Sequence, residues 1–289
     1  MYLKYKDDII PPLARWGRVM QSLWKRLFII ATSLLVVSLT VSGVLWFMKI
    51  NAFETQLAIV RAEQNRMLDR YSELREQVNV RLGRGDDARK FITPDEPAVI
   101  AKVEEVAGSY SSDDKEQWMD YERLAHWVTM NIEYTQDSYA TVLPELTDGN
   151  VRWEDGFWKM PFETLQDEMG DCEDVSALLA SMLLHYNERR FPVWLVGIRT
   201  DDKAHIGIAF PVVNKQLTII DPSGRYSSIF PMGWGLAADD IPVAIDKWLA
   251  HWGGKMKDAY VYMAVSEDIY REFSGTEEFI KWIGEYFGY

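Results

Sequence analysis

The sequence predicts an α+β domain that follows an N-terminal membrane helix and a helical stalk. Three observations support this prediction. A charge-free apolar run covers residues 27–48, a heptad pattern follows it, and the second half of the chain joins a strongly helical segment to three strand-like runs. The chain has 289 residues, of which 48% are hydrophobic and 13% aromatic, so it is long enough to bury a core.

The apolar run, LFIIATSLLVVSLTVSGVLWFM at residues 27–48, has the length of a membrane span. As a helix it would cover about 33 Å, enough to cross the hydrocarbon core of a bilayer. Only Lys49 follows it closely, whereas four basic residues precede it: Arg15, Arg18, Lys25 and Arg26. The positive-inside rule therefore places the N-terminus in the cytoplasm and residues 51–289 outside. A cleaved signal peptide and a buried soluble helix are the alternatives, but the run is too long for an h-region and lacks an A-x-A-like site.

Charge is divided unevenly along the chain. Residues 1–50 carry seven Lys or Arg against two Asp, so the rest of the chain is strongly acidic within a total of −13. Phosphate backbones are bound by clustered basic residues, so this composition argues against a nucleic-acid partner. The division fits a chain that crosses a membrane, although an acidic surface that aids solubility would explain residues 51–289 equally well.

A heptad seam follows the predicted span and indicates a stalk helix over residues 49–85. Two glycines, Gly83 and Gly85, should end this helix, which places the outer domain at residues 86–289 and the cytoplasmic segment at residues 1–26. The seam is short, so pairing with a second copy as a homodimer and docking on the chain's own domain both remain open. Its positions are Phe53, Leu57, Val60, Gln64, Met67, Tyr71, Leu74 and Val78.

The single cysteine lies where a strong helical pattern begins, within Gly170-Asp171-Cys172-Glu173-Asp174. Asp171 is a natural N-cap, and Cys172 then falls in the first helical turn. There the helix dipole lowers the pKa of a thiol, whereas Glu173 and Asp174 raise it. A nearby imidazolium would be needed to favour the thiolate.

Three strand-like runs follow, at residues 193–198, 204–210 and 216–220. His205 shares one face of the second run with Gly207 and Ala209, so a helix can approach that face closely. If this helix is the one that begins at Cys172, the thiol and the imidazole can meet, and Asp221 can orient the ring. Each residue alone also has an ordinary structural explanation, as a buried small side chain, a core histidine or a turn.

We predict no catalytic or metal-binding role for the other segments. A Ca²⁺ loop from Asp148, Asn150, Glu154 and Asp155 lacks the EF-hand register, so ordinary hairpin turns are favoured there. One cysteine and four scattered histidines argue against a zinc site, and we expect no metal or cofactor. The tryptophans of the C-terminal tail, Trp248, Trp252 and Trp282, are interpreted as core residues.

The chain resembles the transglutaminase-like superfamily, a papain-like group of cysteine enzymes. The resemblance rests on the helix LAHWVTMNIEYTQD at residues 124–137, on WKMPFETLQDEMGDCEDV from residue 158, and on Ala204-His205 and Ile220-Asp221-Pro222. It covers roughly residues 95–235, about half of the chain. It implies a catalytic triad of Cys172, His205 and Asp221. In this arrangement a helix that bears Cys172 packs against an antiparallel sheet that bears the other two residues.

The resemblance also implies acyl transfer through a thioester. The backbone N–H of Cys172 is the natural first oxyanion donor. An indole N–H of Trp158 or Trp153 is the candidate second donor, with core packing as the alternative for each. We expect a membrane-anchored extracytoplasmic thiol enzyme that cleaves peptide or isopeptide bonds in a protein or peptide substrate. Cross-linking of protein glutamines and a non-catalytic protein-binding scaffold are the alternatives.

Overall fold

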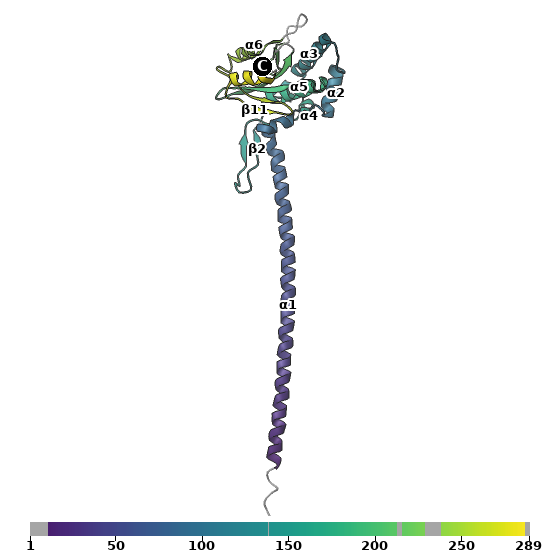
Figure 1. The fold of residues 1–289 in the computed structure, drawn as a ribbon, viewed down its shortest axis with the longest axis vertical. Helices are drawn as coiled ribbons and strands as arrows, with labels where there is room; N and C mark the ends of the chain where they lie inside the picture. The colour runs from purple at the N-terminus through teal and green to yellow at the C-terminus, as the bar shows by residue number, and fades with distance from the viewer. Residues whose placement is uncertain (1–10, 138, 213–215, 229–237, 287–289) are drawn as a thin grey trace, which may run out of the picture. The chain divides into compact units, whose positions relative to one another are not determined.

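The computed structural model describes residues 11–137, 139–212, 216–228 and 238–286 (Figure 1). The chain divides into two compact units, Met1–Ser72 and Glu73–Tyr289. Residues 1–10 of the predicted cytoplasmic segment lie outside the described residues.

Helix α1 (Pro11–Asn79) is one uninterrupted helix of 69 residues (Figure 1). Among the described residues it is the one helix long and apolar enough to cross a membrane. The side chains of the apolar run, such as Leu34 and Phe47, are exposed. A surface of this kind requires an apolar surrounding or a partner.

The last turns of α1 belong to the second unit and are fixed there by polar contacts. The side-chain amide of Asn79 donates to the carbonyl of Leu143 at 3.0 Å and accepts from its N–H at 2.8 Å. After a short 3₁₀ turn, Gly83 adopts the left-handed conformation at φ 56°. A Cβ at Gly83 would collide with the indole of Trp158, so glycine is required here for both backbone and packing.

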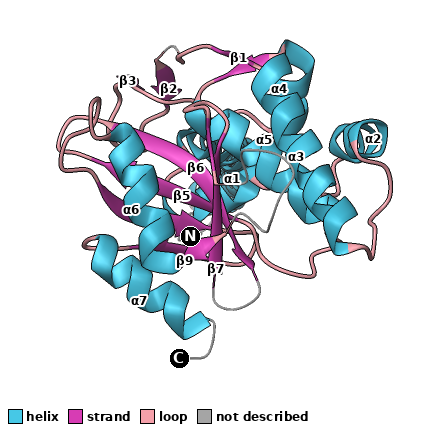
Figure 2. Cartoon of the chain, turned by 90° about the horizontal axis from the view of Figure 1, so that it is seen from above, coloured by secondary structure: helices cyan, strands magenta, loops and turns pink. Residues whose placement is uncertain are grey.

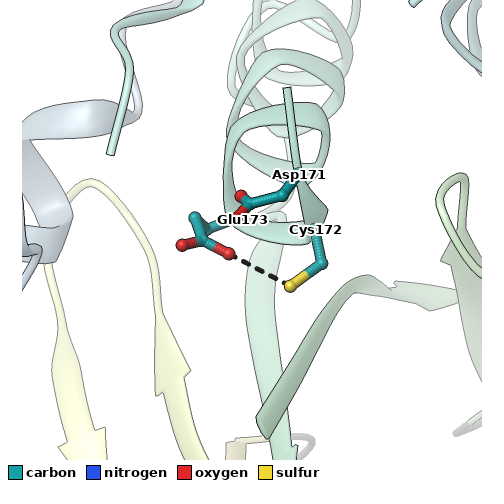
Figure 3. A group of neighbouring side chains, drawn as sticks. All are labelled: Asp171, Cys172 and Glu173. Carbon is teal, nitrogen blue, oxygen red and sulfur yellow. Dashed lines mark hydrogen bonds between the residues drawn. The ribbon is translucent and has the colours of Figure 1, made fainter. Parts of the chain in front are cut away.

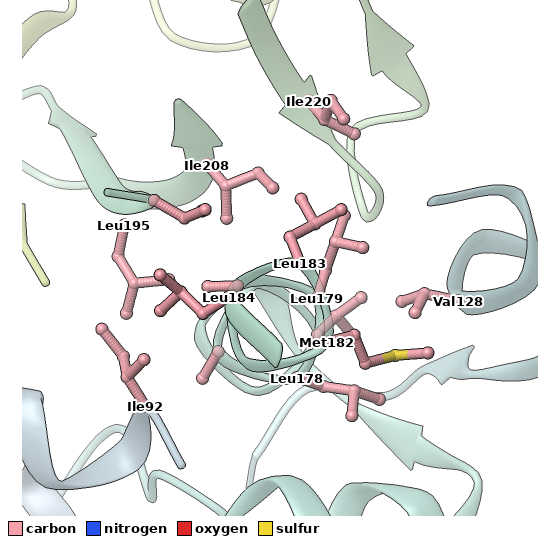
Figure 4. Packing of buried hydrophobic residues seen from close by; sticks show 14 of the residues in the cluster. Ile92, Val128, Leu178, Leu179, Met182, Leu183, Leu184, Leu195, Ile208 and Ile220 are labelled. Carbon is pink, nitrogen blue, oxygen red and sulfur yellow. The ribbon is translucent and has the colours of Figure 1, made fainter. Parts of the chain in front are cut away.

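Helix α5 (Cys172–Tyr186) is the central helix of the second unit, and all but one of its 15 residues are buried. Helices α2 (Pro97–Val106), α3 (Asp114–Asn131) and α4 (Pro161–Asp167) pack around it. Figure 4 shows its leucines against Leu195 and Ile208 of the sheet. Truncating one of these leucines to alanine would cost about 2–5 kcal/mol in stability.

The sheet is antiparallel and has the strand order β11-β10-β5-β6-β7-β8, with β9 paired to β7. The three predicted strands form its centre. Strands β10 and β11 extend it on one side, and β8 and β9 pair with β7 on the other. The strands are β5 (Trp194–Arg199), β6 (Ala204–Val212), β7 (Gln216–Asp221), β8 (Tyr226–Ser227), β9 (Asp239–Asp240), β10 (Tyr260–Val265) and β11 (Tyr270–Glu272).

Alternating side chains give the sheet a separate core on each face. On one face, Ile206, Ile208 and Phe210 of β6 pack in the cluster that surrounds α5. On the other face, Ala209 packs in the cluster that contains α6 (Ile241–Trp252) and α7 (Thr276–Tyr286). Figure 2 shows these two C-terminal helices on the side of the sheet opposite α3 and α5. This arrangement confirms the predicted α+β class.

The helix on the small-residue face of β6 is not the one that begins at Cys172. The helix that approaches the small residues beside His205 is α6, because a Cβ at Gly207 would lie 3.0 Å from the ring of Trp248. Helix α5 instead packs on the isoleucine face, where the Ser176 hydroxyl donates to the carbonyl of Ile206 at 3.1 Å. Branched apolar residues on that face offer α5 a larger area to bury than glycine and alanine do.

Two small sheets complete the unit. Strand β1 (Glu133–Tyr134) pairs in parallel with β4 (Met169–Gly170), the segment that leads into α5. Strands β2 (Ala140–Val142) and β3 (Arg152–Glu154) form a hairpin, as expected for the turn-rich region.

Candidate active site

The turn before α5 brings the thiol to the start of the helix. Gly170 is closely packed there, because a Cβ at this position would lie 2.6 Å from the Cβ of Asp174. Asp171 occupies the N-cap position, but its side chain makes no capping hydrogen bond, which differs from the ordinary role of an N-cap aspartate. Its Oδ1 is buried without a partner among the described residues. Cys172 follows in the first helical turn.

The thiol of Cys172 is buried and donates to Oε2 of Glu173 at 3.0 Å (Figure 3). Burial raises the pKa of this thiol well above its usual range, and the negative charges of Glu173 and Asp171 raise it further. These effects oppose the helix dipole and favour the protonated thiol. The sequence-based expectation that an imidazolium would be needed to favour the thiolate is consistent with this balance.

His205 and Asp221 form a buried pair on the neighbouring strands β6 and β7. Nε2 of His205 lies 2.8 Å from Oδ2 of Asp221. Because a carboxylate accepts, Nε2 carries the ring proton in this arrangement and Nδ1 is the remaining acceptor. Although burial opposes it, hydrogen bonds from His205 and from Trp248 lower the pKa of Asp221.

A cleft of about 1060 Å³ brings Cys172 and His205 to one place. Its other lining residues include Gly83, Trp252 and Tyr262. Asp221 lies behind His205 and is fully buried. The cleft is thus lined by a thiol and by an imidazole whose other nitrogen contacts a buried carboxylate.

The two candidate oxyanion donors lie in different places. Trp158 lines the cleft and is largely buried, with its ring tilted at 55° to that of Phe91 and packed close to Gly83. Its backbone N–H donates to the carbonyl of Arg81 at 2.7 Å, which fixes its position beside the end of α1. Trp153 lies on the β2–β3 hairpin, is 65% exposed and does not line the cleft. The structure therefore brings only Trp158 to the thiol's cleft.

Two residues that contact the candidate site were not identified from the sequence. Trp248 and Trp252 of α6 each donate an indole N–H to Oδ2 of Asp221, at 2.9 Å. Their spacing of four residues on an amphipathic helix was the available signal, but the same spacing is typical of core residues. Trp248 is indeed fully buried in the core, so it has both roles.

Two buried carboxylates and one half-buried carboxylate gather near the start of α5. Asp137, Asp171 and Asp174 each offer an oxygen within 4.8 Å of the others. Burial raises the pKa of Asp174 to about 8, and burial together with the charge of Glu173 raises that of Asp171. Oδ2 of Asp174 is also buried without a partner among the described residues.

An all-oxygen, acidic donor set of this kind suits a hard divalent cation such as Ca²⁺. Such a cation would neutralise the negative charge of the three neighbouring carboxylates. In its absence, their mutual repulsion favours the protonated carboxyl groups. The cluster differs from the loop considered from the sequence. Of those loop residues, Glu154 lies on the β2–β3 hairpin and forms an ion pair with Arg84.

Comparison with known proteins supports the resemblance. Residues 101–229 match the family model described as a transglutaminase-like domain, a range that includes Cys172, His205 and Asp221. Trp248 and Trp252 lie beyond this range. Comparison with curated protein sequences finds no match.

Solved structures with a similar fold include a proposed cysteine protease from Cytophaga hutchinsonii, with 13% identity and a TM-score of 0.31. The alignment covers 48% of this chain and 40% of that protein, so the chain spans less than half of its length. LapG of Legionella pneumophila is also similar, with 15% identity, a TM-score of 0.32 and coverage of 65% of this chain and 93% of LapG. The calcium-bound form of LapG gives 14% identity and a TM-score of 0.30, covering 65% of this chain and 98% of LapG.

Proposed function

We propose that the transglutaminase-like domain of this chain is a cysteine peptidase or amidase, with Cys172 as nucleophile, His205 as general base and Asp221 as the residue that orients the imidazole. The observation that carries the proposal is the buried pair of His205 and Asp221, at 2.8 Å, beside the cleft that also contains the thiol. A histidine with one nitrogen held by a carboxylate is the usual partner of a catalytic thiol.

The reaction begins with transfer of the thiol proton from Cys172 to Nδ1 of His205. The thiolate sulfur then attacks the carbonyl carbon of a peptide or isopeptide bond and forms a tetrahedral oxyanion. As the C–N bond breaks, the imidazolium gives its proton to the leaving amine, and a thioester remains. Water attacks the thioester while His205 takes its proton, and the carboxylic acid leaves with the thiol restored.

The developing oxyanion needs hydrogen-bond donors close to the thiol. The backbone N–H of Cys172 at the start of α5 is one candidate. The indole N–H of Trp158 is the other, because this residue lines the same cleft and its position is fixed by Gly83 and Arg81. Trp153 is not proposed for this role.

We place the domain outside the cell membrane. Residues 1–26 would be cytoplasmic, residues 27–48 would span the bilayer, residues 49–85 would form the stalk and residues 86–289 the catalytic domain. The apolar segment of α1 and the charge asymmetry of its flanks support this topology. The exposed seam residues of α1, Phe53 and Met67 among them, would allow a homodimer through the stalk.

The substrate would be a protein or peptide. Transfer to lysine rather than water would make the enzyme a cross-linking transglutaminase. A non-catalytic binding module is the alternative of a different class, and it is favoured by the hydrogen bond from the thiol to Glu173 and by the burial that raises the thiol pKa.

The test is alkylation of the full-length protein in mild detergent with iodoacetamide from pH 5 to pH 9. Cys172 is the chain's only cysteine, so labelling reports on this thiol alone. We expect His205→Ala to slow labelling near neutral pH, whereas His126→Ala, an exposed histidine on α3, should leave it unchanged. Equal profiles for the wild type and His205→Ala would contradict the proposed base.

Activity supplies the second arm of the test. Cys172→Ala should abolish amide cleavage or transfer on a protein substrate mixture. Activity that stays within about tenfold of the wild type, or roughly 1.4 kcal/mol in barrier, would show that the thiol is not the nucleophile.

A further inference from the structure

Helix α6 presents two indole N–H groups to the carboxylate behind the candidate catalytic histidine. Trp248 and Trp252 are one helical turn apart and therefore lie on the same side of α6. Each donates to Oδ2 of Asp221 at 2.9 Å. This is the same oxygen that contacts Nε2 of His205 at 2.8 Å.

The other carboxylate oxygen is held from a different direction. Oδ1 of Asp221 accepts from the backbone N–H of Gly224 at 2.7 Å and from the hydroxyl of Ser223 at 3.3 Å. Donors therefore hold both oxygens of a fully buried side chain. Hydrogen bonds of this number keep a carboxylate ionised despite burial and prevent it from rotating.

The ring of Trp252 also covers the imidazole. The ring centroids of Trp252 and His205 are 4.0 Å apart with an interplanar angle of 40°. Trp252 lines the cleft and also donates to the buried carboxylate. Trp248 lies further from the imidazole, with a centroid distance of 6.5 Å.

Two glycines leave room for these rings. A Cβ at Gly207 would lie 3.0 Å from the ring of Trp248. A Cβ at Gly224 would lie 2.7 Å from the ring of Trp252 and would also collide with the carboxylate of Asp221. The strand β6 and the turn after β7 are thus shaped to admit both indoles.

We propose that Trp248 and Trp252 are positioning residues that act on His205 through Asp221. This inference rests on the proposed function, and it assigns a role in the site to a helix outside the range of the family match. The two indole donors fix Oδ2 so that it accepts from Nε2, which leaves Nδ1 to take the thiol proton. The Trp252 ring excludes water that would compete for the contact between His205 and Asp221.

Phenylalanine at either position separates this role from packing, because it keeps an aromatic ring but cannot donate. The matched control is Trp282→Phe on α7, whose ring packs against Trp194 and Phe273 in the same core cluster and away from Asp221. The variants Trp248→Phe, Trp252→Phe and their double are compared with this control in the full chain.

The measurement is the rate of Cys172 alkylation by iodoacetamide as a function of pH, with thermal melting of each variant as a check on folding. We expect each single variant to move the profile partway toward that of His205→Ala, and the double variant to move it further. At pH 7 the double variant should react about tenfold more slowly than wild type. This loss is smaller than the one expected when a general base is removed altogether. Trp282→Phe should retain the wild-type profile.

The outcomes separate this inference from the proposed function. If His205→Ala itself leaves the profile unchanged, the proposed base is wrong. If His205→Ala changes the profile but Trp252→Phe and the double variant match Trp282→Phe, the positioning role is wrong. Trp252 is the less buried of the two tryptophans, so Trp252→Phe decides the question even if Trp248→Phe fails to fold.

Discussion

The thiol of Cys172 donates a hydrogen bond of 3.0 Å to the carboxylate of Glu173, its next neighbour in the sequence. A nucleophile at the start of a helix would ordinarily gain from the dipole. Here burial and the neighbouring carboxylates raise the pKa of the thiol instead. These effects favour the protonated thiol, so in the proposed mechanism its activation requires transfer of the proton to His205.

Replacing Glu173 by glutamine should make the thiol more reactive. The substitution removes a negative charge that raises the thiol pKa, so the thiolate fraction at pH 8 increases. We expect alkylation by iodoacetamide at pH 8 to become severalfold faster, because a lower thiol pKa increases the reactive thiolate fraction. Glu168→Gln, at the end of α4, is the control. A rate equal to or below that of the wild type would show that Glu173 does not restrain the thiol.

Asp221 should stabilise the fold above acidic pH. Its pKa is lower in the folded protein than its ordinary value, since the donors around it outweigh the burial that opposes ionisation. A group with a lowered folded pKa contributes stability above its unfolded pKa of about 3.9 and loses it as pH falls through the folded value. Urea unfolding at pH 7 and pH 3 should therefore show that Asp221→Asn costs more stability at pH 7. A cost that is independent of pH would contradict this linkage, and Asp201→Asn, an exposed position, is the control.

Gly170 should not tolerate a side chain. Its Cβ would lie 2.6 Å from the Cβ of Asp174, and neither backbone can move without displacing the start of α5. We expect Gly170→Ala to cost about 1–3 kcal/mol in the free energy of unfolding. Gly254→Ala is the matched control, because a Cβ there meets nothing within 4 Å. Equal melting temperatures for the two variants would show that this turn can relax.

Local periodicity predicted the elements of this fold but not how they pack. The helix at Cys172 and the strand of His205 follow from spacing of apolar residues over a few turns or positions, and the structure contains both. The choice of which helix covers which face of β6 depends on side chains distant in sequence. Gly207 indicated a close approach, but only the structure identifies Trp248 as the approaching residue.

The sequence likewise predicted some features of the candidate site and not others. Cys172, His205 and Asp221 could be proposed because each lies at or near an end of a predicted element and because together they match a known order of residues. The contacts of Trp252 with Asp221 and of Asp137 with Asp174 join segments far apart in the chain, and a single sequence carries no signal for such pairs. The N-cap position of Asp171 was predictable, but the absence of a capping hydrogen bond from its side chain was not.

The proposed topology makes the domain accessible from outside the cell. Protease added to intact cells should remove residues 86–289, since the apolar segment at residues 27–48 would leave them outside the bilayer. Immunoblotting with a tag at the C-terminus measures the loss, and a cytoplasmic protein in the same cells serves as control. Protection in intact cells with digestion only after lysis would reverse the orientation.

The carboxylates near the start of α5 should respond to divalent cations. Asp137, Asp171 and Asp174 converge within 4.8 Å, and two of their buried oxygens have no partner among the described residues. A cation that binds only the folded state stabilises it in proportion to the logarithm of its concentration over its dissociation constant. We expect the melting temperature to rise by several degrees in millimolar CaCl₂ relative to EDTA. At a calcium concentration 100 times the dissociation constant, binding stabilises the folded state by about 2.7 kcal/mol. Asp137→Asn should abolish most of this rise, whereas Asp148→Asn, in the loop between β2 and β3, should retain it. An equal rise in both variants would place calcium elsewhere, and no rise in the wild type would show that the cluster is neutralised by protons alone.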